Sequence, residues 1–151
     1  MQAVILIGVP GAGKTSFYRE RFFETHVRIS LDMLAARERE RILVACCLQA
    51  RQPFVIDNTN VLAADRAAYV SAAKSAGFRV IGYWFTTELR AALARNKART
   101  DKKPVPVPAV IRSLKRLEPP TPQEGFDELF TVKVDSNRQF EVSEFTESRS
   151  E

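Results

Sequence analysis

A short stretch near the N-terminus brings together glycines, one lysine and hydroxyl residues. It is GVPGAGKTS, residues 8–16, in which Gly8, Gly13, Lys14 and Thr15 fit the spacing G-x-x-x-x-G-K-[ST]. Glycines at these positions let successive backbone N–H groups converge on phosphate oxygens. The lysine neutralises the charge of the β- and γ-phosphates, and the hydroxyl ligates Mg²⁺. The spacing therefore predicts a site for ATP and Mg²⁺, with Thr15 as the metal ligand.

The surroundings of this stretch also fit a phosphate-binding loop. An apolar run at 3–7 predicts a buried parallel strand before it, and SFYRERFF predicts a helix after it. The positive end of the helix dipole adds to the attraction for phosphate. The residues that we expect to contact the nucleotide here are Gly8, Pro10, Gly11, Ala12, Gly13, Lys14, Thr15 and Ser16.

Polar residues follow the next two predicted strands. HVRISLD ends at Asp32, and PFVID ends at Asp57, which is followed by Asn58, Thr59 and Asn60. Ligands of open α/β sheets bind beyond the carboxyl ends of the strands, so these side chains should converge on the phosphate loop. A carboxylate there accepts the proton of an attacking hydroxyl or holds water bound to Mg²⁺. Two structural alternatives stay open, namely a helix N-cap at Asp32 and an ordinary Asx or Thr turn after the third strand.

Two arginines on a later predicted helix suggest a second contact with phosphate. Arg95 and Arg99 stand four residues apart in ELRAALARNKAR and therefore share a helical face. Arginines on a segment opposite the phosphates can clamp the charge that develops during phosphoryl transfer. The helix dipole by itself also favours cations at a helix C-terminus, so the pair equally fits a solvated helix end.

The order of the predicted elements indicates the fold class. Helices and strands alternate after the loop, which predicts an α/β fold, a three-layer α/β/α sandwich of P-loop NTPase type with a mainly parallel central sheet. We expect a continuous helical stretch over 33–50, a helix over 63–76 and a late strand over 129–134. Prolines between residues 104 and 108 interrupt the helical pattern and predict a helical, proline-containing lid.

Length and composition indicate a single domain. The 151 residues carry a formal net charge of +5, which suits an anionic ligand but is also common in cytosolic proteins. No apolar run approaches the ~20 residues of a membrane span, and the first core strand begins too early for a signal peptide. We interpret Cys46 and Cys47 as buried thiols and expect a cytoplasmic protein. The expected domain covers residues 1–136, and a polar tail over 137–151 is either frayed or ordered by packing of its phenylalanines.

Four stretches, in this order, resemble the 5′-kinase domain of polynucleotide kinases. They are GVPGAGKTS, ISLD, FVIDNTN with DRAAYVSAAKSAGF, and ARNKARTDKKPVPVPAVIRSLKRLEPPTPQEGF. The resemblance implies a stand-alone kinase that transfers the γ-phosphate of ATP to the 5′-hydroxyl of a DNA or RNA end. It assigns ATP and Mg²⁺ to Lys14 and Thr15, the role of general base to Asp32, and a lid contact with the phosphates to Arg99, with Arg95 before it.

The resemblance also implies an acceptor side, where the chain departs from the family pattern. Residues 57–60 would lie along the acceptor. The family usually carries an arginine three residues after the general base, where this chain has Ala35. We expect Arg39, one helical turn further on, to reach back toward the acceptor, whereas Arg37 faces elsewhere.

Three functions stay open on the sequence. The first is an ATP-dependent kinase acting on the 5′-hydroxyl of DNA or RNA. The second is a P-loop kinase for a small nucleoside, sugar or antibiotic, which Ala35 favours because the expected arginine is missing. The third is a nucleotide-binding module with little or no turnover, for which Asp32 and a basic lid would be superfluous. A nucleoside triphosphate is the expected ligand, no membrane contact is expected, and the sequence identifies no protein partner.

Overall fold

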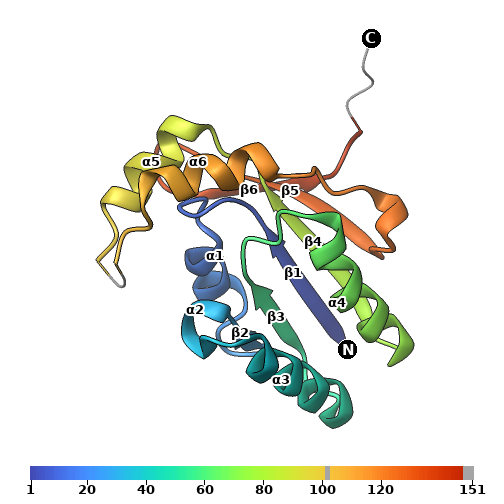
Figure 1. Cartoon of the computed structure of the whole chain (residues 1–151). Helices are drawn as coiled ribbons and strands as arrows, with labels where there is room; N and C mark the ends of the chain where they lie inside the picture. The colour runs from blue at the N-terminus through green and yellow to red at the C-terminus, as the bar shows by residue number, and fades with distance from the viewer. Residues whose placement is uncertain (101–102, 148–151) are drawn as a thin grey trace.

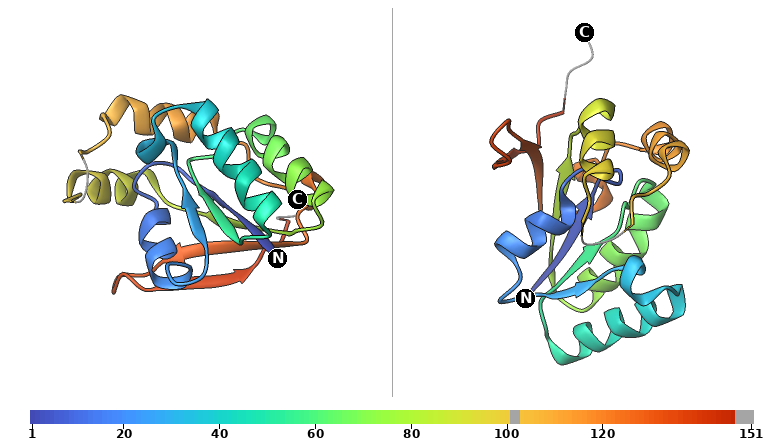
Figure 2. Two further views of the ribbon diagram at one scale, coloured as in Figure 1. Left: turned by 90° about the horizontal axis from the view of Figure 1, so that it is seen from below. Right: turned by 90° about the vertical axis from the view of Figure 1, so that its left-hand side faces the viewer.

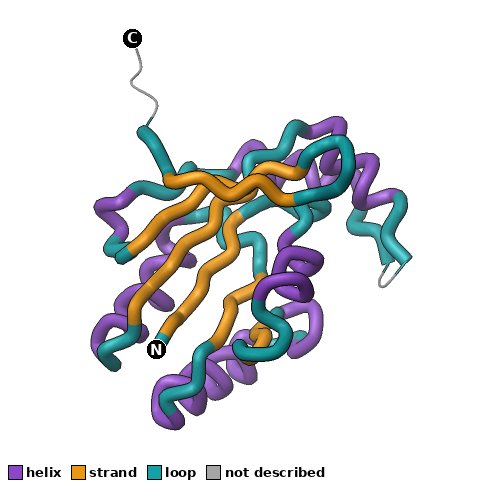
Figure 3. Tube along the Cα trace, turned by 180° about the vertical axis from the view of Figure 1, so that it is seen from behind, coloured by secondary structure: helices purple, strands orange, loops and turns teal. Residues whose placement is uncertain are grey.

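The computed structural model describes residues 1–100 and 103–147, and the strands among them form one six-stranded sheet (Figures 1 and 3). The strand order is β2-β3-β1-β4-β5-β6. The first five are parallel to their neighbours, and β6 is antiparallel to β5. The strands are β1 Gln2–Ile7, β2 Val27–Ile29, β3 Phe54–Asp57, β4 Arg79–Phe85, β5 Glu128–Val134 and β6 Phe140–Glu144.

Helices cover both faces of this sheet, with α1 on one side and α3 and α4 on the other (Figure 2). Alternation along β1 explains the two cores: Ile5 and Ile7 pack in the cluster beneath α3 and α4, whereas Val4 and Leu6 pack in the cluster that contains α1 residues. The α-helices are α1 Lys14–Arg21, α2 Leu31–Leu34, α3 Arg37–Ala50, α4 Ala63–Ser75, α5 Leu89–Lys97 and α6 Val107–Arg116, and a short 3₁₀ helix, η1, covers Pro122–Glu124.

The predicted three-layer α/β/α fold with a mainly parallel sheet is therefore confirmed. Every residue of β3 and all but the first residue of β1 are buried, as expected for central strands covered on both faces. The lid segment between β4 and β5 contains α5, α6 and η1, with the prolines between α5 and α6 and in the first turn of α6.

The helical stretch expected over residues 33–50 is interrupted. Ala35 adopts a left-handed conformation with φ 61° and ends α2, and Ala36 is extended before α3 begins at Arg37. Alanine is the best helix former, so nothing in the local sequence signals this break. It separates Asp32, in the first turn of α2, from the register of α3 and thereby changes which arginines face the site.

The expected polar tail over 137–151 is corrected in its central part. Residues Phe140–Glu144 form β6, paired in register with β5. The ring of Phe140 packs edge-on against Phe17 of α1, with 5.2 Å between the ring centroids. The ring of Phe145 lies 5.9 Å from that of Trp84. Packing of the phenylalanines thus orders this segment, and residues 148–151 of the predicted tail lie outside the described residues.

Two further features bear on the sequence predictions. Cys47 is buried as expected, but Cys46 is exposed, because adjacent residues of α3 point in different directions and only one of the pair faces the sheet. Within the described part of the chain, no helix has the length and apolar character needed to cross a lipid bilayer.

Candidate active site

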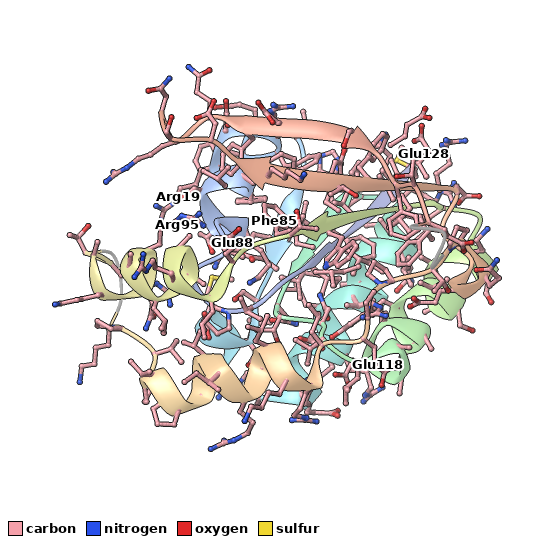
Figure 4. The ribbon with its side chains drawn as sticks, turned by 90° about the horizontal axis from the view of Figure 1, so that it is seen from above. Arg19, Phe85, Glu88, Arg95, Glu118 and Glu128 are labelled. Atoms are coloured by element: carbon pink, nitrogen blue, oxygen red, sulfur yellow. The ribbon has the colours of Figure 1, made fainter. Side chains whose placement is uncertain are left out.

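A cavity of about 510 Å³ lies where β1, β2 and β3 end. Its wall combines the phosphate loop after β1, Asp32 after β2 and residues 57–60 at the end of β3. These three strands are parallel and adjacent, so their carboxyl ends meet at one edge of the sheet. Figure 4 labels Arg19 of α1 and Arg95 of α5, which both line this cavity. The volume is in the usual range for a small-molecule site.

The phosphate loop depends on glycine where the lid helix approaches it. Gly11 has φ 82°, and a Cβ atom there would lie 2.4 Å from the carbonyl oxygen of Ala92 in α5. Arg95, one turn further along α5, donates a hydrogen bond from Nη1 to the carbonyl oxygen of Gly11 at 3.1 Å. Gly13 has φ 101° and forms the N-cap of α1. The loop therefore presents its backbone to the cavity while α5 packs directly on it.

Lys14 is held inside the loop by two hydrogen bonds. Its Nζ donates to two carbonyl oxygens of the loop, at 2.8 and 2.9 Å, and the side chain is buried. Burial lowers the pKa of Lys14 to about 8; Asp57 and Asp32 oppose the shift, and the Arg99 guanidinium adds to it. The three neighbours that act on its charge are the predicted catalytic and substrate residues, so the structure brings them together around Lys14.

Thr15 and Asp57 are hydrogen-bonded to each other. Thr15 Oγ1 donates to Asp57 Oδ2 at 2.9 Å, and Arg28 Nε of β2 donates to the same oxygen at 2.8 Å. Mg²⁺ prefers oxygen ligands and is often bound by one or two protein oxygens together with substrate phosphates, so this hydroxyl and carboxylate fit the ion. Asp57, which we expected along the acceptor, thus contacts a side chain of the phosphate loop.

Several residues that we expected to touch ligand instead hold the loop in place. Gly8 and Ala12 do not line the cavity: Gly8 N donates to the carbonyl oxygen of Thr59 at 2.9 Å, and Ala12 is fully buried. Asn60 is 4% exposed, and its Nδ2 donates to the carbonyl oxygen of Leu6 at 2.7 Å. Thr59 and Asn60 reach the cavity wall, but these bonds tie the end of β3 to the start of the loop.

Asp32 lines the cavity from the first turn of α2. The residue at the N-cap of α2 is Ser30, so the alternative role of Asp32 as a helix N-cap is wrong. Asp65 of α4 also lines the cavity, but its charge acts on Arg37, whose pKa is raised by Tyr69, Glu40 and Asp65 against the effect of burial. Of these two carboxylates, Asp32 is the one whose charge raises the pKa of Lys14.

The break after α2 reverses the prediction for two arginines. Arg39 does not line the cavity, and its Nη1 donates to the carbonyl oxygen of Leu34 at 2.9 Å. Arg37 does line the cavity, and its Nη1 donates to Glu40 Oε1 and to Tyr69 Oη, both at 3.1 Å. The expected register assumed an unbroken helix, and the extended backbone at Ala36 rotates α3 relative to it.

The lid contributes Arg95 and Arg99 to the site, and the side chain of Asn96 joins helix α5 to the proline-containing segment. Both arginines line the cavity, and burial lowers the pKa of Arg95. Asn96 is buried: its Nδ2 donates to the carbonyl oxygen of Val105 at 2.6 Å, and its Oδ1 accepts from Val105 N at 2.8 Å. These two bonds tie the end of α5 to the segment before α6 and so fix the base of the turn that carries Arg99.

A model of the AAA domain family AAA_33 matches residues 4–120. The chain belongs to this family. Its fold resembles that of Kti12 from Chaetomium thermophilum, solved in complex with ADP-AlF3, with a TM-score of 0.66, 18% identity and coverage of 90% of this chain and 92% of that chain.

Two further solved structures share the fold of this AAA_33 domain. A gluconokinase from Sinorhizobium meliloti 1021 matches with a TM-score of 0.59 and 19% identity, covering 88% of this chain and 82% of that chain. A structure of the PezAT chromosomal toxin-antitoxin system of Streptococcus pneumoniae matches with a TM-score of 0.60 and 14% identity, covering 98% of this chain and 74% of that chain. The AAA_33 domain thus shares its α/β fold with these three solved structures.

The AAA_33 chain also has cavity residues that sequence reasoning missed. At one end the wall is formed by Arg19 together with Val134, Arg138 and Phe140 of the β5–β6 hairpin. Val134 ends the strand predicted over 129–134, whereas Arg138 and Phe140 lay in the predicted tail. Packing of the phenylalanines was one alternative for that tail, but no local pattern indicated that Phe140 would pack against α1. Arg28 does not line the cavity but pairs with Asp57, which does; it was missed because it stands inside a strand, although its position four residues before the predicted base could have drawn attention.

Proposed function

We propose that this protein transfers the γ-phosphate of ATP to a hydroxyl group, and that the acceptor is the 5′-hydroxyl end of DNA or RNA. The observation that carries the proposal is that Lys14, Asp32 and Arg99 line one cavity, in which the charges of Asp32 and Arg99 act on the pKa of Lys14. Phosphoryl transfer needs a cationic cradle for the phosphates and a carboxylate for the attacking hydroxyl, because positioning and electrostatics supply most of the catalysis.

The residues have separate roles in this proposal. The backbone of the phosphate loop and Lys14 hold the β- and γ-phosphates, which requires Lys14 Nζ to leave its two loop carbonyls. Arg95 and Arg99 contact the same phosphates from the lid. Asp32 accepts the proton of the attacking hydroxyl as that oxygen bonds to the γ-phosphorus and the bond from the γ-phosphorus to the bridging oxygen breaks.

Thr15 and Asp57 would hold Mg²⁺ near the phosphates, the first directly and the second directly or through water. When bound, the ion neutralises charge on the phosphate oxygens. The hydrogen bonds that Asp57 accepts from Thr15 and Arg28 keep its carboxylate at the end of β3 in the ligand-free protein.

The two ends of the cavity suggest how the ligands are arranged. The end formed by Arg19, Val134, Arg138 and Phe140 combines cations with an aromatic ring, which suits a nucleoside. The opposite end carries Asp32, Asp65 and Arg37. In the proposed arrangement Arg37 contacts the phosphate that follows the reacting nucleoside of the acceptor strand. It thereby replaces the arginine that the family usually carries at the position of Ala35.

A small hydroxyl compound is the second candidate acceptor. Arg37 already donates to Glu40 and Tyr69, so it is less available for an acceptor phosphate than an arginine without such partners. That contact favours a nucleoside or a sugar with no phosphate of its own.

The decisive experiment offers γ-labelled ATP and Mg²⁺ to the purified protein with 5′-hydroxyl oligonucleotides and, separately, with nucleosides and sugars. Label on the oligonucleotide supports the first candidate, and label only on a small compound supports the second. No label on any acceptor, with ATP bound, would contradict phosphotransfer altogether.

Two pairs of variants sharpen this test. We expect Asp32→Asn to lower kcat by about 10²–10⁴-fold with little change in the KM for ATP, and Asp65→Asn to cause a clearly smaller loss. For a nucleic-acid acceptor, Arg37→Met should raise the KM for the oligonucleotide about tenfold, whereas Arg39→Met should leave it unchanged. Equal effects of the two arginine variants would count against the proposed acceptor contact.

A further inference from the structure

Glu40 is a buried carboxylate that the proposed reaction does not use. It lies on the inner face of α3 and is 4% exposed. Three donors converge on it: Tyr69 Oη of α4 donates to Oε1, Arg37 Nη1 donates to Oε1 at 3.1 Å, and Asn58 Nδ2 donates to Oε2 at 2.8 Å. Burial and the bond to Glu40 raise the pKa of Tyr69. A buried carboxylate with this many partners fixes the orientation of the groups that donate to it.

One of these donors continues the network toward the candidate base. The side-chain amide of Asn58 faces Glu40 with its nitrogen, and its Oδ1 accepts a hydrogen bond from Leu31 N at 2.8 Å. Leu31 is the first residue of α2 and directly precedes Asp32. Three hydrogen-bonded groups therefore connect the interior of α3 to the backbone that carries Asp32.

The short helix α2 depends on this external contact. It has only four residues, Leu31–Leu34, and its N-cap residue Ser30 makes no side-chain capping hydrogen bond. The Oδ1 of Asn58 thus takes the part that a capping side chain normally plays, accepting a bond from a backbone N–H of the first turn.

We propose that Glu40 is a positioning residue, which sets the place of Asp32 by fixing the orientation of the Asn58 amide. An ionised carboxylate can only accept hydrogen bonds, so it requires the NH₂ group of Asn58 to face it and leaves the amide oxygen for Leu31 N. The structural part of this inference stands on the contacts alone, and its catalytic part rests on the proposed function.

The donor and acceptor pattern gives the inference a reciprocal test. In Glu40→Gln, the introduced amide oxygen can still accept from Tyr69 and Arg37, but its NH₂ group then faces Asn58. Asn58 must turn its oxygen toward that group, which brings two donors together at Leu31 N. In the double variant Glu40→Gln with Asn58→Asp, the introduced carboxylate accepts from the introduced amide NH₂ group and from Leu31 N. Every group of this hydrogen-bonded network then has a partner again.

The experiment measures two quantities in the full chain and its variants. The first is hydrogen exchange of the Leu31 amide in the nucleotide-free protein, followed by NMR. The second is kcat for phosphotransfer, together with the KM for ATP. For Glu40→Gln we expect Leu31 to exchange about tenfold faster and kcat to fall about ten- to a hundredfold, with the KM for ATP nearly unchanged. The double variant should recover most of both losses. Arg37→Met, which removes a donor from Glu40 but leaves the bonds of Asn58 to Glu40 and to Leu31 in place, should keep slow exchange at Leu31.

Each result decides the matter. Unchanged exchange at Leu31 in Glu40→Gln, or no recovery in the double variant, overturns the inference. Equally fast exchange in Arg37→Met would also overturn it, because a general loosening of the α3–α4 contact, which Arg37 makes through Tyr69, would then account for the effect. If the unsubstituted protein transfers phosphate to no acceptor, the proposed function fails, while the exchange of the Leu31 amide still tests the role of Glu40.

Discussion

The proposed nucleotide side of the cavity is built mainly from backbone, whereas the proposed acceptor side is built from side chains that hold one another. On the first side, nine consecutive residues, 8–16, supply the loop, and helix α5 packs directly on Gly11. On the second side, the network of Glu40, Asn58 and Leu31 joins three segments that are distant in sequence. On the first side, removing a single chemical group should therefore be enough to abolish function. On the second side, function should be lost when a hydrogen-bond network is broken.

Charge divides the molecule in a related way. Residues 89–117, the part of the lid segment from the start of α5 to the C-cap of α6, carry nine lysines and arginines against one aspartate, in a chain whose net charge is only +5. The rest of the chain is therefore slightly acidic, and the cations are gathered on the segment that carries Arg95 and Arg99. This distribution concentrates positive potential beside the phosphate loop, where it favours anionic ligands.

The largest effect should come from the one cation inside the loop. We expect Lys14→Met to lower kcat/KM by about 10³-fold or more, because the phosphates lose the charge nearest to the group in transfer. Lys133→Met, which removes an exposed lysine of β5, is the matched control and should change kcat/KM by less than about twofold. Substantial turnover by Lys14→Met would mean that the lid arginines alone hold the phosphates.

A large loss of stability, rather than of activity, should follow from removing a buried arginine that contacts the segment after β3. Arg66 of α4 is fully buried; its Nε donates to Glu124 Oε1 at 2.7 Å and its Nη1 donates to the carbonyl oxygen of Asn60 at 2.8 Å. Arg66→Met leaves Glu124 and that carbonyl without their partner, so the free energy of unfolding should fall by about 3–5 kcal/mol.

The matched control for this prediction is an exposed pair of the same type. Arg41 and Glu38 are both exposed on α3, and Arg41 Nη2 lies 2.5 Å from Glu38 Oε1. Arg41→Met should change the unfolding free energy by less than about 0.5 kcal/mol. Urea unfolding of both variants measures the difference. Similar small losses in the two would show that the buried pair does not support the end of β3.

The contact between loop and lid gives an intermediate effect. Gly11→Ala combines a left-handed backbone with a Cβ atom 2.4 Å from the carbonyl oxygen of Ala92, so we expect a loss of about 2–4 kcal/mol and weaker nucleotide binding. Gly77→Ala is the control, because its φ is 78° but the nearest atom to a Cβ is a flexible arginine nitrogen at 3.8 Å. It should cost only about 1 kcal/mol. Equal losses in thermal or urea unfolding would show that α5 moves away from the loop at little cost.

The two sides also differ in how well the sequence predicts them. The phosphate loop and its flanking elements are local, and their spacing identifies Lys14 and Thr15 before any fold is known. The alternation of apolar runs likewise predicts the parallel sheet, because buried strands and amphipathic helices leave periodic patterns in the chain. These predictions fail only in detail, as at Gly8 and Ala12, which support the loop without lining the cavity.

The acceptor side could not be predicted in the same way. Its geometry depends on the left-handed Ala35, which breaks a stretch with every local sign of a continuous helix. That break decides that Arg37 and not Arg39 lines the cavity. The role of Glu40 depends on contacts with Tyr69 and Asn58, and no local pattern reports which distant side chains will meet. Strand β6 was missed for a related reason: packing of the phenylalanines was one alternative for this polar segment, but no local pattern shows that Phe140 meets α1.

The smallest predicted effect is a dependence of nucleotide affinity on pH. Burial lowers the pKa of Lys14 to about 8 in the ligand-free protein, so the charged fraction of this side chain falls as pH rises from 7 to 9. Bound phosphates, which are ionised throughout this range, favour the charged form and raise its pKa. Affinity for ATP should therefore weaken about tenfold between pH 7 and pH 9, and binding at pH 8 should take up about half a proton.

Calorimetry in buffers of different ionisation enthalpy measures the proton uptake and the affinity together. Lys14→Arg is the informative variant, because a guanidinium stays charged over the whole range and should abolish both the slope and the uptake even if it binds ATP more weakly. A slope that persists in Lys14→Arg would assign the proton to another group. An affinity independent of pH in the unsubstituted protein would mean that Lys14 does not neutralise the charge of the phosphates. Binding of the nucleotide would then depend, like the acceptor side, on residues distant in sequence such as Arg95 and Arg99.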